Sequence, residues 1–225
     1  MPPLTVSLSL PEEHKLSDFL RLSQEAAFRH LTELGLAGLA ERQGLAWVII
    51  RIRAELPAPP SKTLTVTTWP GKEKAGMMPR YCEMYNPDGS CAARLVTTWV
   101  LADSATRQMR MDAPLSVPDM SRGDEPPVPR ALPRRELPLL GNYIPAAGQI
   151  DSNGHVNNAA YLDLATAFVP EDPEGRRVTA FAVDYRAEIL PGTKVSVCGE
   201  MREDTFLLSG KSDGREHFRM TLTYG

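Results

Sequence analysis

The feature of this sequence that most constrains its fold is one order of segments that occurs twice. Residues 17–34 place apolar side chains at helical spacing, and four strand-like segments rich in β-branched and aromatic residues follow them. Residues 155–169 repeat the helical pattern, and four more strand-like segments follow. Such a chain is predicted to fold as two copies of one unit, each with a helix and an antiparallel sheet.

Two local matches support an internal duplication. "RAELP" at 53–57 resembles "RAEILP" at 186–191, which places Glu55 and Glu188 at equivalent positions, and "DGSCAARLVTTW" resembles "DGREHFRMTLTY". Both matches occur in the same order within the same arrangement of a helix followed by strands. Because two copies are too few for a solenoid, we expect two similar domains rather than a repeat array.

The predicted fold class is α+β, as a tandem (double) hotdog: two long helices, each wrapped by a curved antiparallel β-sheet. Joining the two sheets edge to edge would cover strand edges that otherwise favour aggregation. A doubly wound fold is disfavoured because the strands follow one another without intervening helices. The expected boundaries are an N-terminal hotdog at 1–111, a linker at 112–138 and a C-terminal hotdog at 139–225, because residues 112–138 hold seven prolines and no apolar period.

Composition and charge exclude several classes of protein. The net charge is −3, whereas binding to nucleic acid usually requires a basic face, so no nucleic-acid partner is expected. Cys82, Cys91 and Cys198 are odd in number and widely spaced, which argues against a disulfide framework or a zinc site, and neither a metal nor a cofactor is predicted. Apolar segments fall short of the roughly 18 residues of a membrane span, and the start lacks a secretory signal pattern. We therefore expect a cytoplasmic protein without a membrane span.

The stretch "DSNGHVNNAAY" at 151–161 concentrates polar side chains between apolar residues. Asp151, Asn153 and His155 alternate, so in an extended or looped lead-in their side chains would point to one side. A helix beginning near His155 would add free N–H groups and the positive end of its dipole, which favour an oxyanion. This set suits thioester hydrolysis, because a thiol with a pKa of about 8.5 leaves without a metal or a strong acid. An Asx-rich turn that caps a helix is the alternative interpretation.

The same stretch resembles the signature of the acyl-acyl-carrier-protein (acyl-ACP) thioesterases, double-hotdog enzymes of plant plastids and bacteria, which runs Asp-x-Asn-x-His-Val-Asn-Asn-x-x-Tyr. The resemblance extends to "LSQEAAFRHLTELGL", "LAWVIIRIRAELPAPPSKTLTVTTW" and "RLVTTWVLADSATRQMRM", so it covers most of the chain and both halves. The sequence departs from the family at Leu164, where the family's helix usually has Trp. It also shows no plastid transit peptide, which favours a bacterial-type enzyme.

The resemblance implies catalytic roles for four residues. The signature gives Asp151, Asn153 and His155, and the family's strand motif Tyr-Arg-x-Glu maps onto "YRAE", which gives Glu188. From its residue type and pattern alone, Glu188 is interpreted as a strand residue that faces water. Plant members often carry a Cys after that Glu, whereas Ile189 stands here, so a cysteine mechanism is not available.

The function that this resemblance implies is hydrolysis of the thioester of fatty acyl-acyl carrier protein, which releases free fatty acid and terminates chain elongation. The second hotdog would carry the chemistry, with Asp151 as nucleophile or general base. His155 and Glu188 would position water or relay a proton, and Asn153 would orient the thioester or a carboxylate partner. The first hotdog would hold the acyl tail. The expected partner is acyl carrier protein, and the protein is expected to be a monomer or a homodimer.

Three alternative functions stay open at this point. An acyl-CoA thioesterase of the hotdog superfamily differs in the carrier rather than in the chemistry. A hotdog hydratase acting on enoyl thioesters has an Asn-Pro in its motif, whereas no Pro follows Asn153. A non-catalytic acyl-binding protein would need a DNA-binding or partner-binding appendage, and the first residues show no helix-turn-helix pattern.

The remaining aromatic and histidine side chains give weaker signals. Trp47, Trp69 and Trp99 are expected to be core and pocket-wall residues that line apolar volume, rather than stacking platforms for bases, because no basic stripe accompanies them. The other histidines have no carboxylate or Cys companions at metal-ligand spacing. No role is therefore predicted for His14, His30 or His217.

Overall fold

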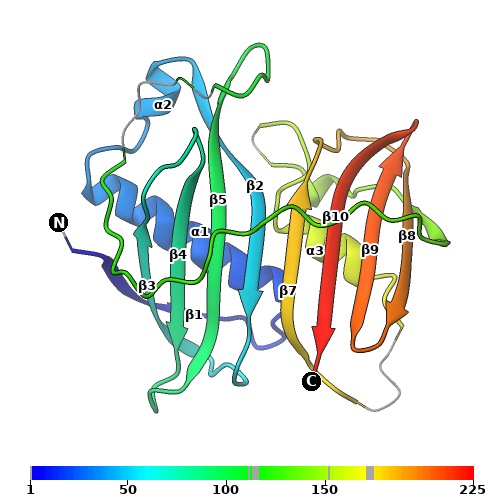
Figure 1. Ribbon diagram of the computed structural model, residues 1–225, viewed down its shortest axis with the longest axis horizontal. Coiled ribbons are helices and arrows are strands. Elements are labelled where there is room, and N and C mark those ends of the chain that lie inside the picture. Colours follow the sequence, from blue (N-terminus) through cyan, green and yellow to red (C-terminus); the bar gives the residue numbers. More distant parts are fainter. Residues whose placement is uncertain (1, 111, 113–116, 152, 171–174) are drawn as a thin grey trace. The chain divides into compact units, whose positions relative to one another are not determined.

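The computed structural model describes every residue except 1, 111, 113–116, 152 and 171–174. The chain forms two compact units: unit 1 holds residues 1–14 and 19–129, and unit 2 holds residues 15–18 and 130–225. In each unit a helix lies against one face of an antiparallel sheet (Figure 1). The predicted α+β class is confirmed.

Unit 1 contains an antiparallel sheet with the strand order β1-β3-β4-β5-β2. The predicted strand segments of the first half correspond to β2, β3, β4 and β5. The elements in chain order are β1 (Leu4–Ser9), most of α1 (Leu16–Glu33), α2 (Leu39–Arg42), β2 (Leu45–Glu55), β3 (Thr63–Pro70), β4 (Met78–Tyr85) and β5 (Cys91–Asp103).

Helix α1 forms because its apolar residues recur on one face. Phe19, Leu20 and Ala26 lie on that face and are at most 3% exposed. The helix ends before Gly35, whose φ of +70° is a conformation that glycine adopts at little cost. Its bounds agree with the predicted 17–34 to within one residue at each end. None of the described helices is both long and apolar enough to cross a membrane.

Unit 2 contains an antiparallel sheet with the strand order β7-β10-β9-β8-β6. Helix α3 lies behind β10 in the view of Figure 1, and its Tyr161 packs edge to face on Phe218 of β10 at a centroid distance of 5.7 Å. The elements in chain order are β6 (Leu139–Tyr143), the 3₁₀ turn η1 (Ala147–Gln149), α3 (Ala160–Thr166), β7 (Val178–Tyr185), β8 (Val195–Arg202), β9 (Thr205–Ser212) and β10 (Arg215–Tyr224).

Equivalent hairpins in the two units agree with the predicted duplication. Gly89 stands in the turn before β5 with φ +86°, and Gly214 stands in the turn before β10 with φ +76°. Both glycines occupy the left-handed region that tight hairpin turns require. The arginines that follow at the same distance, Arg94 and Arg219, lie in the strands β5 and β10.

The sequence interpretation misses strand β1, which lies in the segment before the first helix. Leu4 and Leu8 of β1 are buried, and the strand pairs antiparallel with β3. The alternation of apolar and polar residues in "LTVSLS" was the available signal. A six-residue strand so close to the chain start needs a partner strand for its stability, and the sequence does not specify that partner.

The proline-rich segment carries neither helix nor strand in its described part, residues 112 and 117–138. On unit 1, the main-chain N–H of Met120 donates to the carbonyl of Pro70 at 3.1 Å. On unit 2, the main-chain N–H of Leu132 donates to the buried Asp184 carboxylate at 2.7 Å. These bonds satisfy two main-chain N–H groups in a segment that belongs to no sheet.

Candidate active site

Main-chain hydrogen bonds close a small loop around the polar cluster of unit 2. A β-bridge joins Ile150 to Val156, and the N–H of Asp151 donates to the carbonyl of His155 at 2.9 Å. Gly154, with φ +79°, donates its N–H to the carbonyl of Asp151 at 3.1 Å. An Asp followed three residues later by Gly is typical of a tight turn. Of the extended or looped lead-in that the sequence predicts, the structure shows the looped form.

The imidazole of His155 lies between two carboxylates. Its Nδ1 is 3.6 Å from Oδ2 of Asp151, and its Nε2 is 3.8 Å from Oε1 of Glu188. The exposed fractions of the three side chains are 18% for Asp151, 16% for His155 and 38% for Glu188. The structure thus brings together three of the four predicted site residues, with one acid near each ring nitrogen of the histidine. Nδ1 is also 3.2 Å from the carbonyl oxygen of Val156, to which it can donate a hydrogen bond.

Asn153, the fourth predicted site residue, contributes a main-chain contact to this cluster. Its side chain is exposed to solvent. Its main-chain N–H donates to Oδ1 of Asp151 at 2.8 Å, so its backbone helps to hold that carboxylate.

Glu188 lies beyond the end of strand β7, which stops at Tyr185. The N–H groups of Arg186 and Ala187 both donate to the carbonyl of His217, at 2.8 and 3.2 Å, so the regular ladder ends there. The interpretation of Glu188 as a strand residue is therefore wrong, while its side chain is partly open to water. Released from the strict alternation of a strand, its carboxylate turns toward the imidazole of His155.

Tyr161 of α3 fixes the segment that carries Glu188. Its hydroxyl donates to the carbonyl of Ala187 at 3.2 Å and accepts from the N–H of Ile189 at 3.0 Å, so it bonds the residues on both sides of the glutamate. Tyr161 is 2% exposed, and burial raises the pKa of its phenol, which keeps the hydroxyl proton available for donation. The N–H of Val156 donates to the carbonyl of Ile189 at 2.9 Å and ties the neighbouring loop to the same segment.

We expect Tyr161→Phe to lower the free energy of unfolding by about 1–3 kcal/mol, because the buried N–H of Ile189 loses its acceptor. We also expect kcat to fall about fivefold, because Glu188 is held less firmly. Denaturant titration and steady-state kinetics measure the two effects. Tyr185→Phe is the matched control: it removes a buried hydrogen bond of 2.7 Å to the carbonyl of Asn158 and leaves the Glu188 segment intact. Equal kcat values for the two variants would contradict the positioning role.

His217, for which the sequence predicts no role, contacts the segment that carries Glu188. Its Nε2 is 2.6 Å from Oγ of Ser212, and its Nδ1 is 3.4 Å from the carbonyl of Ala187. Burial lowers the pKa of His217, and hydrogen bonds with the main chain of Ala187 and Glu188 oppose that shift. The available signal was the repeat itself, because "DGREHF" has His where "DGSCAA" has Ala92.

Helix α3 begins at Ala160, not at His155. The N–H of Asn157 donates to the carbonyl of Gln149 at 2.8 Å, and its side-chain oxygen accepts from the N–H of Ala159 at 2.9 Å. These bonds form an Asx turn before the helix. The predicted helix N-terminus beside His155 is therefore wrong, and the alternative of an Asx turn accounts for Asn157.

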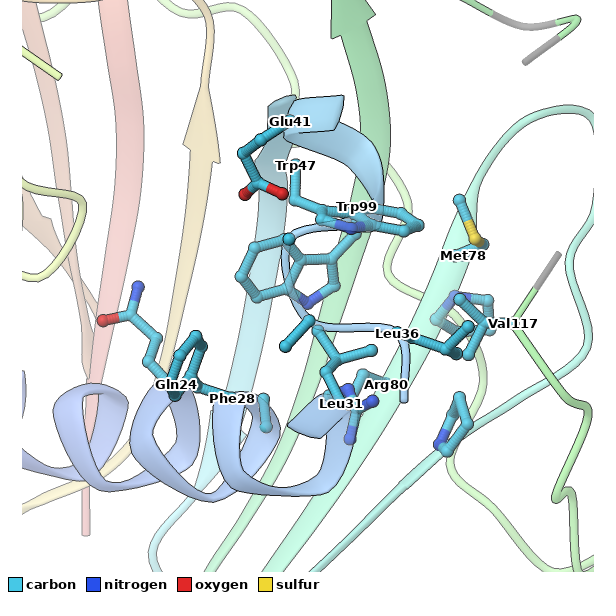
Figure 2. Close-up of a pocket in the computed structure, with 15 residues that line it drawn as sticks. Gln24, Phe28, Leu31, Leu36, Glu41, Trp47, Met78, Arg80, Trp99 and Val117 are labelled. Atoms are coloured by element: carbon cyan, nitrogen blue, oxygen red, sulfur yellow. The ribbon is translucent and has the colours of Figure 1, made fainter. Parts of the chain in front are cut away.

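Unit 1 contains an apolar pocket with a volume of about 200 Å³ (Figure 2). Trp47 of β2 and Trp99 of β5 contribute to its wall together with Leu31 of α1. Trp69 is buried in a separate hydrophobic cluster, where it stacks on Tyr81 at a centroid distance of 5.7 Å. The prediction of core and pocket-wall positions for the three tryptophans is confirmed.

Sequence comparison relates both halves of the chain to known domains. The acyl-ACP thioesterase N-terminal domain matches residues 8–114, and the acyl-ACP thioesterase C-terminal domain matches residues 139–219. A chloroplastic acyl-[acyl-carrier-protein] hydrolase of Cuphea viscosissima is 26% identical over 191 residues, which cover 73% of this chain and 45% of that protein. The chain spans about half the length of the curated relatives it matches.

Two solved structures share the fold over almost their whole length. An acyl-ACP thioesterase from Bacteroides thetaiotaomicron has a TM-score of 0.83 at 20% identity and covers 99% of this chain and 98% of its own. The 12:0-ACP thioesterase from Umbellularia californica has a TM-score of 0.84 at 17% identity, with coverages of 99% and 97%. At these identities the likeness establishes the fold, and the predicted double hotdog is confirmed.

Proposed function

This chain belongs to the acyl-ACP thioesterase family, and from that premise we propose that it hydrolyses the thioester of fatty acyl-acyl carrier protein. The products are a free fatty acid and the thiol of the carrier, and their release ends chain elongation in fatty acid biosynthesis. The observation that supports this proposal is the imidazole of His155 between the carboxylates of Asp151 and Glu188. The partner is acyl carrier protein, and the proposed compartment is the cytoplasm.

The geometry of the cluster supports a division of roles. Asp151 is held by the N–H of Asn153 and is the nucleophile or the general base. A neutral imidazole donates a proton at one nitrogen and accepts at the other, so His155 can move a proton between Asp151 and Glu188. The distances of 3.6 and 3.8 Å exceed those of hydrogen bonds, and such contacts often shorten when substrate binds.

Two reaction routes are compatible with these roles. In the first, a water molecule loses a proton to the cluster, its oxygen bonds to the thioester carbon, and the C–S bond breaks as the sulfur takes up a proton. In the second, an oxygen of Asp151 bonds to the carbonyl carbon and the thiolate leaves, after which water hydrolyses the acyl-aspartyl anhydride. A single turnover in water enriched with oxygen-18 that leaves label in Asp151 would establish the second route, because only attack of water on the aspartyl carbonyl of the anhydride places the label there.

Asn153 is assigned a contact with substrate rather than with the cluster. Its side chain is exposed, so its amide is available to a group that arrives from solvent. An amide offers both donors and an acceptor, which suits orientation of a thioester carbonyl and its neighbouring amides. The acyl tail is assigned to the apolar pocket of unit 1, whose wall includes Trp47 and Trp99.

The direct test of the proposed function is the release of free thiol and free fatty acid from acyl carrier proteins loaded with medium-chain and long-chain acyl groups. We expect turnover with these substrates, and slower turnover with the matched acyl-CoA thioesters. Faster turnover of the CoA thioesters would reassign the carrier and keep the hydrolase chemistry. Absence of fatty acid release from both carriers would overturn the proposal.

We expect EDTA to leave the activity unchanged, because the proposed chemistry uses carboxylates and an imidazole alone. In the part of the chain that the structure describes, no group of three or more His, Cys, Asp and Glu side chains is arranged to hold a metal ion. The measurement is the initial rate of thiol release before and after dialysis against EDTA. Loss of activity that added zinc restores would contradict the metal-free mechanism.

A further inference from the structure

The pocket of unit 1 has a buried arginine among its apolar walls. Arg80 of β4 lines the pocket and is 6% exposed (Figure 2). Its Nη1 donates to Oγ1 of Thr68 at 3.2 Å and lies 3.3 Å from Nδ1 of His30. Among the described residues no carboxylate pairs with this guanidinium. Buried arginines are ordinarily paired with an acid, because an isolated buried charge is costly.

The charge on Arg80 persists near neutral pH. Burial lowers the pKa of its guanidinium to about 10, which still leaves it protonated at pH 7. Burial, and to a smaller extent the charge of Arg80, lower the pKa of His30. A neutral His30 accepts at Nδ1 but contributes no negative charge. The two neighbours of the guanidinium therefore hold it in place without neutralising it.

The guanidinium has hydrogen-bond donors left for a group in the pocket. It carries N–H groups on three nitrogens, and both contacts to Thr68 and His30 come from Nη1. The N–H groups of Nε and Nη2 are thus available to an acceptor. Oxygen acceptors, and carboxylates above all, match the planar fork of an arginine.

Most of the rest of the wall is suited to an aliphatic chain. Trp47, Trp99, Leu36 and Met78 line the pocket, and Gln24 and Glu41 are its other polar lining residues besides Arg80. Its volume of about 200 Å³ exceeds the roughly 150 Å³ that holds a benzene molecule. A chain that is hydrocarbon throughout would fill this space and leave the charge of Arg80 buried without an acceptor. A chain that brings an oxygen with it would satisfy both the walls and the guanidinium.

We propose that this pocket takes a fatty acyl chain that carries an oxygen acceptor near its far end, and that Arg80 recognises this acceptor. The substrate class is therefore an oxygen-functionalised acyl group, such as an ω-hydroxyacyl or ω-carboxyacyl thioester. This inference rests on the proposed function in one respect, since it takes the ligand of the pocket to be the acyl group of the substrate. Arg80 is on this view a specificity-determining residue, separate from the hydrolytic cluster.

The first experiment measures binding without hydrolysis. The probes are pantetheine thioethers that cannot be cleaved, with a dodecyl, an ω-hydroxydodecyl or an ω-carboxyundecyl chain. Fluorescence of Trp47 and Trp99 in the pocket wall reports occupancy. We expect the wild-type protein to bind at least one of the two oxygen-bearing probes about tenfold more tightly than the dodecyl probe, as a charge-assisted hydrogen bond allows. Equal or tighter binding of the dodecyl probe would overturn the inference, whatever the hydrolytic activity.

The second experiment assigns the discrimination to Arg80. We expect Arg80→Met to abolish the preference while binding the dodecyl probe no more weakly than wild type. Arg94→Met is the matched control, because Arg94 is an exposed arginine of β5 that does not line the pocket, and it should keep the preference. Arg80→Lys keeps the charge without the planar fork and is expected to lose most of the preference, which provides a second variant if Arg80→Met does not fold. An unchanged preference in a folded Arg80 variant would contradict the assignment.

The third experiment separates failure of this inference from failure of the proposed function. It measures kcat/KM for dodecanoyl and for ω-hydroxydodecanoyl acyl carrier protein. The ratio of these two values is compared with the ratio of the affinities of the two matching thioethers. If neither thioester is hydrolysed, the proposed function fails while the binding ratio still decides the role of the pocket. If both are hydrolysed with the dodecanoyl chain preferred, the proposed function stands and the inference about Arg80 is wrong.

Discussion

Replacement of His155 by alanine, or of Asp151 by asparagine, is expected to lower kcat by at least about 100-fold while the protein stays folded. Each change removes a group that holds or moves a proton, and such groups typically contribute about 10²–10⁴-fold to the rate. Asp151→Asn is nearly isosteric, and its side-chain oxygen can still accept the hydrogen bond from the N–H of Asn153 that forms the turn. The effect should therefore appear in kcat rather than in the melting temperature.

Two exposed residues provide matched controls for these variants. His14→Ala removes a histidine outside the cluster, and Asp213→Asn changes an exposed aspartate in the turn between β9 and β10. The φ of Asp213, +47°, is a conformation that asparagine also adopts. Both controls should retain kcat within a factor of about two. Near-normal turnover in either site variant, measured as release of free thiol from acyl carrier protein, would remove the site assignment.

Most of the sheet and the first helix were predictable because their signals are local. Residues 17–34 alternate between an apolar and a polar face with helical spacing, and α1 occupies nearly that range. The strands β2 to β5 and β7 to β10 coincide with runs of β-branched and aromatic residues, and turn residues lie between these runs. Such patterns require only that one face of an element be buried, whatever covers it.

The second helix shows where local patterns fail. Residues 155–159 continue the apolar spacing of α3, yet their main chain is engaged by bonds from elsewhere, including the donation from Val156 to Ile189 and from Asn157 to Gln149. Ile189 is distant in the sequence, and Gln149 lies in the neighbouring 3₁₀ turn η1. A tertiary hydrogen bond of this kind overrides helical propensity, which is a difference of only a few tenths of a kcal/mol per residue.

The candidate site was predictable in its composition but not in its geometry. The sequence singled out Asp151, His155 and Glu188, and the structure places their side chains together. Two supports of the Glu188 segment, Tyr161 and His217, were not identified as such, because their hydrogen bonds reach across 26 and 30 positions in the chain. A sequence pattern shows which residues are unusual, whereas long-range bonds decide where the side chains point.

The duplication provides a matched pair of glutamates for the last test. Glu55 and Glu188 occupy equivalent positions in the two repeated stretches, but the structure gives them different surroundings. Glu55 is the last residue of β2, is exposed, and stands opposite Arg94 in the ladder with β5. Glu188 lies beyond the end of β7 with its carboxylate 3.8 Å from Nε2 of His155. The prediction that the two glutamates share a strand context is therefore wrong. Glu55 belongs to a strand and Glu188 does not, and their neighbouring residues differ as well.

We expect Glu188→Gln to lower kcat at least about tenfold with little change in melting temperature, whereas Glu55→Gln should stay within a factor of about three of wild type. Gln keeps the size and most of the hydrogen bonding of Glu but lacks the charge and the ability to accept a proton, so the pair isolates the role of the carboxylate beside His155. Melting temperatures should barely change, because Glu188 is 38% exposed and Glu55 is exposed, and surface substitutions usually shift stability by no more than about 0.5 kcal/mol. Steady-state release of thiol from a medium-chain or long-chain acyl carrier protein measures both variants under one condition. A larger loss in Glu55→Gln would place the chemistry in unit 1 and contradict the assignment of the site to Asp151, His155 and Glu188.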